Sequence, residues 1–274
     1  MTNGYEYTDV IYEVRGTVAV ITMNRPEKLN ALSAGMTEGM AVALKAAQVD
    51  SGVRVVVITG AGRGFCSGQD LQARSLAEGR GLPDGVEPTI ADRRYNIHAI
   101  QAVARAAQQL DKPYLAALNG PAAGAGLDLA SMADIRFAAK GARFTTAFAR
   151  NGIVSGDGGC YYLPRIVGMA KALDLMWTSR MFDADEALEL GYVTKVVEPE
   201  ALMDETMAYA EMLSNCAPIS VQYIKQLAYQ SQNTDLDTAL RMAQYMQTIA
   251  TSTEDALEGP RAFREKRPPN FAGR

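Results

Sequence analysis

Val53-Arg-Val-Val-Val-Ile-Thr-Gly60-Ala-Gly-Arg-Gly64-Phe-Cys-Ser-Gly68-Gln-Asp-Leu71 is an apolar run that ends in a glycine-rich turn. A second such run is Pro113-Tyr-Leu-Ala-Ala-Leu-Asn-Gly120-Pro-Ala-Ala-Gly124-Ala-Gly126-Leu-Asp128-Leu. Each pattern predicts a buried strand, a tight turn and then a helix whose first N–H groups have no acceptor within the helix. Small residues let a ligand approach the backbone, so two such turns side by side would offer two donors to one oxygen. We therefore expect the active site at these turns.

Length, composition and charge are those of an ordinary globular protein. With 274 residues, of which 48% are hydrophobic, the chain is long enough to bury a sizeable core. The 27 Lys and Arg residues against 31 Asp and Glu residues give a net charge of −4, and no dense basic block is present. Neither nucleic acid nor an anionic membrane surface is therefore an expected partner. A small-molecule ligand fits this composition better.

The cysteines and the apolar segments indicate the compartment. Cys66, Cys160 and Cys216 are scattered without metal-ligand spacing, which argues against a disulfide framework and against a metal site. The first ten residues are polar and acidic, and the most apolar later stretch is interrupted by Asn119 and Pro121, so neither a signal peptide nor a membrane span is predicted. We expect a cytoplasmic protein.

The first part of the chain predicts an alternating α/β order. Alternation over Val10–Val14 and Thr17–Met23 predicts an antiparallel hairpin, and Ser33 is expected to open a helix that runs to about Gln48. The region 72–91 has several Gly and Pro residues and no periodicity, which is typical of a loop that lines a binding site. Further strands are expected at 53–59, 114–118 and 135–138, and further helices at 92–110 and 124–132.

The last third is predicted to be helical. Strand patterns nearly vanish there apart from Val193–Val197, and both Asp183–Glu186 and Thr251–Glu254 match the capping-box pattern of a helix start. Long helices, each with one apolar face to bury, are expected over Glu200–Asn215, Ser220–Gln230 and Leu236–Ala250. We expect an α/β core over residues 1–195 and a helical region over 196–274 that packs on the core, on another subunit, or on both.

Specific motifs are spread over nearly the whole chain. Beside the two glycine turns they are Ile21-Thr-Met-Asn-Arg-Pro-Glu-Lys-Leu-Asn-Ala-Leu32, Leu163-Pro-Arg-Ile-Val-Gly168, Thr253-Glu-Asp-Ala-Leu-Glu-Gly259 and Phe263-Arg-Glu-Lys266-Arg. Together these motifs resemble those of the enoyl-CoA hydratase/isomerase superfamily, also called the crotonase fold. The resemblance implies an α/β fold, a spiral of ββα repeats, with a helical C-terminal region that builds homotrimers, commonly stacked into hexamers.

The resemblance also implies the binding site of an acyl-CoA thioester. In the family the thioester carbonyl lies between two backbone N–H groups, which here match those of Gln69 and Ala125. Enolate formation puts negative charge on that oxygen, and each pre-aimed donor stabilises it by about 3 kcal/mol. Coenzyme A is part of the substrate, so no separate cofactor is expected. Its contacts carry over to Lys28, Leu29, Ala31, Gln69, Asp70 and Leu71, and to Phe263 and Lys266, which in the family come from a neighbouring subunit.

The acid–base residues depart from the hydratase pattern. Hydratases of the family have a glutamate where this chain has Asp128, which is one methylene and about 1.5 Å shorter. Their second glutamate aligns with Phe148. A candidate replacement is Asp157, one place after the carboxylate of related isomerases. As alternatives, Asp157 caps the helix that starts near Gly158, and Asp128 forms a structural salt bridge or cap.

Other side chains carry weaker expectations. His98, the single histidine, lies on a predicted helix that carries a functional histidine in some relatives, but spacing to Pro113 puts the matching position at Gln101. A catalytic role for His98 is therefore not favoured. Tyr161 and Tyr162 could line the acyl pocket, although core packing is favoured for both.

Four functions remain open. The leading hypothesis is an enoyl-CoA hydratase in which Asp128, assisted by Asp157, activates water. The absence of a second glutamate also fits an enoyl-CoA isomerase, in which one carboxylate moves a proton between carbons. A hydrolase or dehalogenase would use Asp157 as nucleophile. A non-catalytic acyl-CoA binder would keep the two turns without the acid–base pair.

Overall fold

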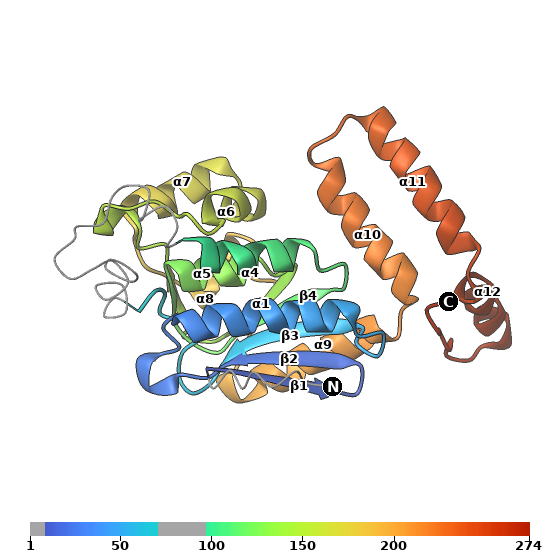
Figure 1. Ribbon diagram of the computed structural model, residues 1–274, viewed down its shortest axis with the longest axis horizontal. Helices are drawn as coiled ribbons and strands as arrows, with labels where there is room; N and C mark the ends of the chain where they lie inside the picture. Colours follow the sequence, from blue (N-terminus) through green and yellow to red (C-terminus); the bar gives the residue numbers. More distant parts are fainter. Residues whose placement is uncertain (1–8, 71–96) are drawn as a thin grey trace, which may run out of the picture.

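The computed structural model describes residues 9–70 and 97–274 and has a six-stranded sheet at its centre (Figure 1). β1 pairs antiparallel with β2, and the other neighbours in the order β1-β2-β3-β4-β6-β9 are parallel. The strands are β1 Val10–Arg15, β2 Val18–Met23, β3 Val55–Gly60, β4 Tyr114–Leu118, β6 Ile135–Ala139 and β9 Lys195–Val197. Parallel neighbours need crossover connections, which is why helices alternate with these strands along the chain.

A second, small sheet has the order β5-β7-β8. Its strands are β5 Ala122–Ala123, β7 Arg143–Thr145 and β8 Phe182–Asp183. The α-helices are α1 Ala34–Val49, α4 His98–Gln108, α5 Ala125–Ser131, α6 Gly159–Val167, α7 Met169–Thr178, α8 Ala184–Glu189, α9 Leu202–Ser214, α10 Pro218–Ser231, α11 Leu236–Thr251 and α12 Glu254–Glu265. The 3-10 helices are η1 Pro26–Lys28, η2 Ala149–Asn151 and η3 Pro199–Ala201. The second glycine turn thus runs from β4 through β5 into α5.

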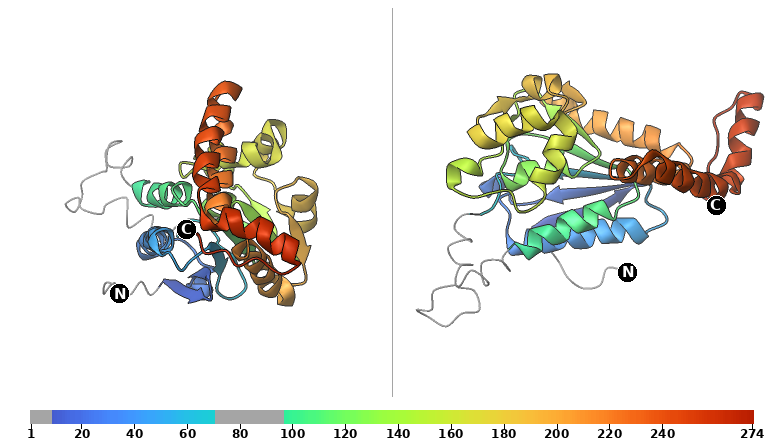
Figure 2. Two further views of the ribbon diagram at one scale, coloured as in Figure 1. Left: turned by 90° about the vertical axis from the view of Figure 1, so that its right-hand side faces the viewer. Right: turned by 90° about the horizontal axis from the view of Figure 1, so that it is seen from above.

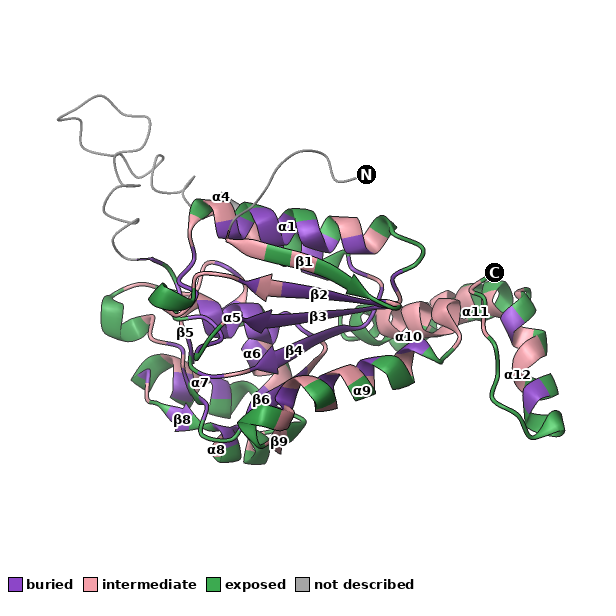
Figure 3. Ribbon diagram, turned by 90° about the horizontal axis from the view of Figure 1, so that it is seen from below, coloured by how far each residue is buried: buried purple, intermediate pink, exposed green. Residues whose placement is uncertain are grey.

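Helices cover both faces of the large sheet, with α1 on one side and α9 on the other (Figure 3). Successive side chains of a strand point to opposite faces, so a strand between two helical layers is apolar at every position. The side chains of β2 and β3 that share a cluster with α1 and α4 are Ala19, Ile21, Met23, Val56 and Ile58. Those that share a cluster with α9 are Val18, Val20, Val55 and Val57.

Several elements begin and end where the sequence predicts. The hairpin forms with Arg15 opposite Val18, and the Ser33 hydroxyl caps α1 by accepting a hydrogen bond from Met36 N. Asp183 caps α8 as the capping box predicts. The second capping box is wrong by two residues, because α11 continues through Thr251 and the cap of α12 is Thr253, whose hydroxyl accepts from the backbone N–H three residues on.

The two glycine turns are joined by backbone hydrogen bonds. Phe65 N and Cys66 N both donate to the carbonyl of Pro121 at 3.1 Å, and Ala123 N donates to the carbonyl of Cys66 at 3.0 Å. A Cβ at Gly126 would collide with that same Cys66 carbonyl. Glycine is therefore required where α5 passes the first turn.

Two asparagines hold the shape of the first turn. The buried Asn30 donates from Nδ2 to the carbonyls of Ala61 at 2.9 Å and Gly64 at 2.8 Å. Asn119, from the end of β4, donates from Nδ2 to the carbonyls of Gly62 at 2.9 Å and Gly64 at 3.2 Å. These turn carbonyls have no hydrogen-bond partner in a helix or a sheet, and the two asparagines supply one. The turn therefore keeps one backbone conformation.

Helices α10, α11 and α12 extend away from the rest of the molecule and form what we call the arm, residues 218–265 (Figures 1 and 2). Polar contacts tie it to the core: Lys225 of α10 pairs with Asp134 at 2.8 Å, and Arg54 donates to the carbonyl of Phe271 in the segment that follows α12. The predicted division after residue 195 stays a prediction. The strand and helix that follow it, β9 and α9, pack with the core, and the helices that leave the core start at Pro218.

The arm exposes many apolar side chains. Neither α10 nor α11 contains a buried residue, although both carry apolar side chains at helical spacing. No helix within residues 9–70 and 97–274 has the length and apolar character needed to cross a membrane. The exposed apolar residues of the arm include Ile224, Leu236, Leu240, Tyr245, Ile249, Leu257 and Phe263.

Alanine at Gly126 is expected to lower the free energy of unfolding by roughly 1–3 kcal/mol, the usual cost of overpacking. Its Cβ would collide with the Cys66 carbonyl, which the turn cannot move without breaking its own hydrogen bonds. Gly35→Ala is the matched control: in α1 its Cβ would have its nearest neighbour 3.5 Å away, and it should stabilise the chain by about 1 kcal/mol. Urea denaturation measures both changes, and a Gly126→Ala protein as stable as the wild type would contradict this account.

Candidate active site

The amides of Gln69 and Ala125 lie where the two turns meet. Gly68, directly before Gln69, has a φ of +93°, and a Cβ built there would lie 3.7 Å from the Ala125 nitrogen and 2.7 Å from the Ala123 carbonyl oxygen. Ala125 is the first residue of α5. Among the hydrogen bonds of the described residues, neither Gln69 N nor Ala125 N is a donor. Both N–H groups can therefore donate to a guest atom.

Asp128 lies three residues after Ala125 on α5 and is 2% exposed. Its Oδ2 is 2.6 Å from the hydroxyl oxygen of Ser155, which is also 3.1 Å from Oδ1 of Asp157. Asp157 is 4% exposed. A Cβ at Gly159 would collide with the Asp128 carboxyl, so the start of α6 is closely packed on it. The structure thus brings the two predicted carboxyls together and adds a hydroxyl between them.

The predicted alternative role of Asp157 as a helix cap is not what the structure has. The cap residue of α6 is Gly158, with no side-chain hydrogen bond to the first turn of the helix. Asp128 likewise has no salt bridge with a described residue. Both carboxyls are therefore held by the contacts around Ser155.

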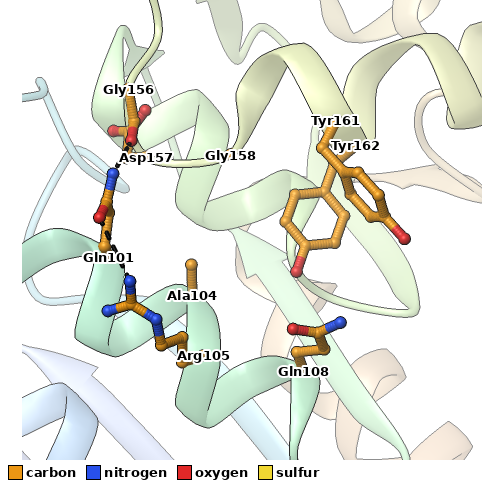
Figure 4. Close-up of a pocket in the computed structure, with 9 residues that line it drawn as sticks. All are labelled: Gln101, Ala104, Arg105, Gln108, Gly156, Asp157, Gly158, Tyr161 and Tyr162. Carbon is orange, nitrogen blue, oxygen red and sulfur yellow. Dashed lines mark hydrogen bonds between the residues drawn. The ribbon is translucent and has the colours of Figure 1, made fainter.

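Asp157 also lines a cavity of about 300 Å³ between α4 and the start of α6 (Figure 4). Gln101 on α4 fixes the loop that carries it, because its Nε2 donates to the carbonyl of Gly156 at 2.8 Å. The expectation of core packing is wrong for Tyr161, which is exposed and lines the cavity. The full lining of described residues is Gln101, Ala104, Arg105, Gln108, Gly156, Asp157, Gly158, Tyr161 and Tyr162.

The surroundings favour the neutral form of Asp128. Burial, the hydrogen bond with Asp157 and the charge of Asp157 raise the pKa of Asp128 well above its ordinary value of 3.8, against a smaller opposing effect of the Ser155 hydroxyl. A carboxyl with a raised pKa keeps its proton at a pH where an ordinary aspartate has lost it, so it can give a proton to a reacting carbon and take it back, which general acid–base chemistry requires.

Phe148 lies beside the second glycine turn. A Cβ at Gly124 would lie 4.0 Å from the Cε1 and Cζ atoms of the Phe148 ring, one residue before the Ala125 amide. The position that aligned with the second glutamate therefore presents an apolar ring at the predicted site. Among the described residues, the side chains of Asp128 and Asp157 supply its carboxyls.

Residues predicted to bind CoA gather after β2. Asp70 is buried, with Arg25 Nη2 at 3.1 Å and Lys28 Nζ at 3.5 Å from its Oδ2. Arg25 also donates to the carbonyl of Ala31 at 2.7 Å, and Leu29 lies between them in the left-handed conformation, with a φ of 49°. The exposed ammonium group of Lys28 is thus held at the surface by Asp70 and remains able to face a phosphate.

Phe263 and Lys266 are not brought to this place. Phe263 lies in the last turn of α12 and Lys266 is the residue that follows this helix, far along the molecule from the glycine turns (Figure 1), and Phe263 is 86% exposed. Within one chain they do not complete the site. Leu71 and the predicted loop 72–91 lie outside the described residues.

His98 and Gln101 differ in position. His98 is exposed at the first residue of α4, whereas Gln101, one turn on, lines the cavity and holds the Asp157 loop. The geometry therefore gives Gln101 and not His98 a place next to the carboxyl pair.

Cys66 supplies no nucleophile to this site. Burial raises the pKa of Cys66 to about 12, so its thiol is protonated at neutral pH, and Cys160 and Cys216 are free thiols at the surface. In the part of the chain that the structure covers, no group of three His, Cys, Asp or Glu residues could hold a metal ion.

Sequence reasoning missed the roles of Ser155 and Arg25. Ser155 lies two residues before Asp157, and a hydroxyl so close to a carboxylate in a glycine-rich loop is a common local hydrogen-bond partner, so this role could have been inferred. Arg25 pairs with Asp70 across 45 residues of sequence, a separation that leaves no local pattern.

Comparison with known proteins shows similarity over the whole chain. The family profile described as enoyl-CoA hydratase/isomerase matches residues 13–274. The short-chain-enoyl-CoA hydratase of Clostridium acetobutylicum is 38% identical over 263 residues, which cover 96% of this chain and 97% of that protein. The 1,2-epoxyphenylacetyl-CoA isomerase of Escherichia coli is 36% identical over 268 residues, 97% and 98% of the two chains. The crystal structure of an enoyl-CoA hydratase from Bacillus anthracis matches with a TM-score of 0.88 at 31% identity, over 97% of this chain and all of that one.

Asp128→Asn is expected to stabilise the fold increasingly as the pH rises. The carboxyl loses its proton in the unfolded chain near 3.8 and in the folded chain only at higher pH, so its contribution to the free energy of unfolding falls between these two values. The amide cannot ionise and avoids this loss. Denaturation over a series of pH values measures the difference, which should grow through that window and then level off.

The exposed Asp237 of α11 provides the control, because asparagine there should leave the pH dependence of unfolding unchanged. A difference between Asp128→Asn and wild type that shrinks with rising pH would contradict the raised pKa.

Proposed function

The chain belongs to the enoyl-CoA hydratase/isomerase family, and from that premise we propose that it is an enoyl-CoA hydratase that adds water to a 2,3-unsaturated acyl-CoA. The observation that carries the proposal is the meeting of two glycine turns with two uncommitted backbone donors, Gln69 N and Ala125 N, and a buried carboxyl, Asp128, three residues after Ala125 on α5. The similarity to a short-chain-enoyl-CoA hydratase over nearly the full length supports the same reaction.

The two amides would act on the thioester carbonyl. Attack of a water oxygen on C3 moves the electrons of the C2=C3 bond toward C1 and puts negative charge on the carbonyl oxygen. Gln69 N–H and Ala125 N–H bind this charge more strongly than the uncharged carbonyl, and each is worth about 3 kcal/mol in the transition state. Backbone groups do this work, so the side chains of these two residues are not required for it.

The carboxyl pair would move the protons. The carboxylate of the pair takes one proton from the attacking water as the bond between oxygen and C3 forms. The carboxylic acid of the pair gives its proton to C2, which completes the addition of H and OH. Asp128 and Asp157 therefore take the place of the two glutamates of the hydratase pattern. No cofactor beyond the CoA of the substrate is needed for this chemistry.

We place the CoA moiety against Lys28, Leu29, Ala31, Asp70 and Leu71, with Lys28 facing a phosphate. In an assembly of several copies, Phe263 and Lys266 at the end of the arm of one copy would reach the CoA bound to another. The reducing interior of a cytoplasm suits the free thiols of this enzyme.

The arm supports a homotrimer, single or stacked into a hexamer. Its two long helices bury no residue within one chain, and Phe263 is among the most exposed apolar side chains. Apolar helix faces of this kind are covered in obligate assemblies. Sedimentation equilibrium of the purified protein should give the mass of three or six chains, and a monomer with full turnover would contradict the proposal.

An enoyl-CoA isomerase is the second candidate. It needs one carboxyl to move a proton between two carbons and no place for water, and the ring of Phe148 beside Gly124 makes the site more apolar. The similarity to an acyl-CoA isomerase over 97% of the chain supports this alternative. Both reactions use the same two backbone donors.

A panel of 2-enoyl-CoA and 3-enoyl-CoA thioesters in heavy water, followed by mass spectrometry, tests the proposal. We expect 3-hydroxyacyl-CoA with deuterium at C2 from the wild type. Asp128→Ala should lower kcat by about 10²–10⁴-fold, the usual contribution of a general acid–base group, with little change in KM. Asp204→Ala, on the exposed side of α9, is the control that keeps the wild-type rate.

The outcomes separate the candidates. A product to which no water has been added but in which the double bond lies at a new position would favour the isomerase. A normal hydration rate in Asp128→Ala would show that the acid–base assignment is wrong, and tight binding of every thioester without turnover would overturn enzymatic function.

Phe148→Glu is expected to raise the hydration rate by about ten-fold or more, because it restores a carboxylate that can hold and activate water beside the second turn. Phe148→Leu, which keeps the site apolar, is the matched control and should leave the ratio of hydration to isomerisation unchanged. The measured quantity is kcat for 3-hydroxyacyl-CoA formation. A glutamate variant that only accelerates double-bond movement would argue against water binding at this position.

A further inference from the structure

Ser155 lies between the carboxyls of Asp128 and Asp157 (2.6 Å and 3.1 Å) and belongs to the loop that Gln101 holds through the Gly156 carbonyl. A hydroxyl group has one proton and so can donate one hydrogen bond at a time, whereas an ionised carboxylate can only accept. Two ionised carboxylates cannot both be bonded to this oxygen. The arrangement is complete when one carboxyl is protonated and donates to the other in the hydrogen bond between Asp128 and Asp157, while the Ser155 hydroxyl donates to the ionised one.

The charges around the pair favour one shared proton. Asp128 and Asp157 are both buried, and no Lys, Arg or His of the described residues forms an ion pair with either of them. The other titratable groups whose charge acts on the pair are the thiols of Cys66 and Cys160 and the phenol of Tyr192, and none of these groups can carry a positive charge. Two adjacent charges without a cation would repel each other strongly in this setting.

The two carboxyls differ in their access to the cavity. Asp157 belongs to the lining of the 300 Å³ cavity, whereas Asp128, on α5, packs against Gly159 and does not line it. A proton that reaches the pair from this cavity therefore meets Asp157 first. The hydroxyl of Ser155 contacts both carboxyls.

We propose that Ser155 is a positioning residue that holds Asp128 and Asp157 in register around one proton, so that this proton returns from one carboxyl to the other after each turnover. This inference rests on the proposed hydration reaction. Ser155 itself need not touch the substrate.

The proton balance of hydration shows why such a step is needed. The carboxylate that takes the proton of water ends as an acid, and the acid that gives its proton to C2 ends as a carboxylate. The pair holds one proton before and after the reaction, but on the opposite residue. The new acid then returns its proton to the other carboxylate across the hydrogen bond between them, while Ser155 Oγ holds the two carboxyls in place, and the starting state returns without exchange with solvent.

Ser155→Ala and Ser155→Thr form the matched pair of variants. Alanine removes the hydroxyl and should lower kcat for hydration by about 10–100-fold, the equivalent of one hydrogen bond to a charged group, with KM within about two-fold of wild type. Threonine keeps the hydroxyl at this half-buried position, so it should restore most of the rate.

The pH profile adds a readout that a merely structural role would not move. A pair that must hold one proton gives a bell-shaped dependence of kcat on pH. Loss of the connecting hydroxyl should displace both limbs in Ser155→Ala, and Ser155→Thr should return them. Unchanged kcat and pH profile in Ser155→Ala would overturn the proposal, as would an equal loss of kcat in the alanine and threonine variants.

Infrared difference spectroscopy of the substrate-free protein separates this inference from the proposed function. A protonated carboxyl band at neutral pH should be present in the wild type, absent in Asp128→Asn and shifted in Ser155→Ala. If that pattern is found but no thioester is hydrated, the proposed function fails while the shared proton stands. If thioesters are hydrated and the band is the same in wild type and Ser155→Ala, the inference fails.

Discussion

The contact between the two glycine turns is the constraint on which the rest of the structure depends. The Cys66 carbonyl accepts from Ala123 N and at the same time leaves no space for a side chain at Gly126. Ala125 lies between Ala123 and Gly126 in the sequence. The packing of the two turns therefore also sets the position of the Ala125 amide. The atoms that make these hydrogen bonds and packing contacts belong to the same turns that carry the candidate site. The site therefore has little freedom to distort.

The buried carboxyls work against the stability of this arrangement. Asp128 and Asp157 lie together without a cation, a state that a folded chain keeps only if other contacts offset it. Those contacts are the apolar clusters on both faces of the large sheet and the hydrogen bonds that Asn30 and Asn119 donate to the first turn. Strain of this kind collects at functional sites, because raised pKa values and uncommitted donors are what the chemistry uses.

Local pattern predicted the elements well and their ends less well. The hairpin, the cap at Ser33 and the strands of the large sheet follow from alternation and capping chemistry, which act over a few residues. At Thr251 the same capping pattern gave the wrong start, because α11 continues past it and Thr253 offers the same hydroxyl two residues on. The small sheet of two- and three-residue strands was not predicted, since so short a segment carries no periodicity.

The sequence by itself determined the two glycine turns, because turn chemistry is a local property. Its motifs also gave the resemblance to the family, and that resemblance implied the candidate residues Gln69, Ala125, Asp128 and Asp157. Only the tertiary structure decided that Ser155 bridges two carboxyls that come from different elements, and that the Phe148 ring lies beside Gly124. Those are distances between segments far apart in the chain. They depend on how the sheet and its helices pack, and no spacing along the sequence encodes them.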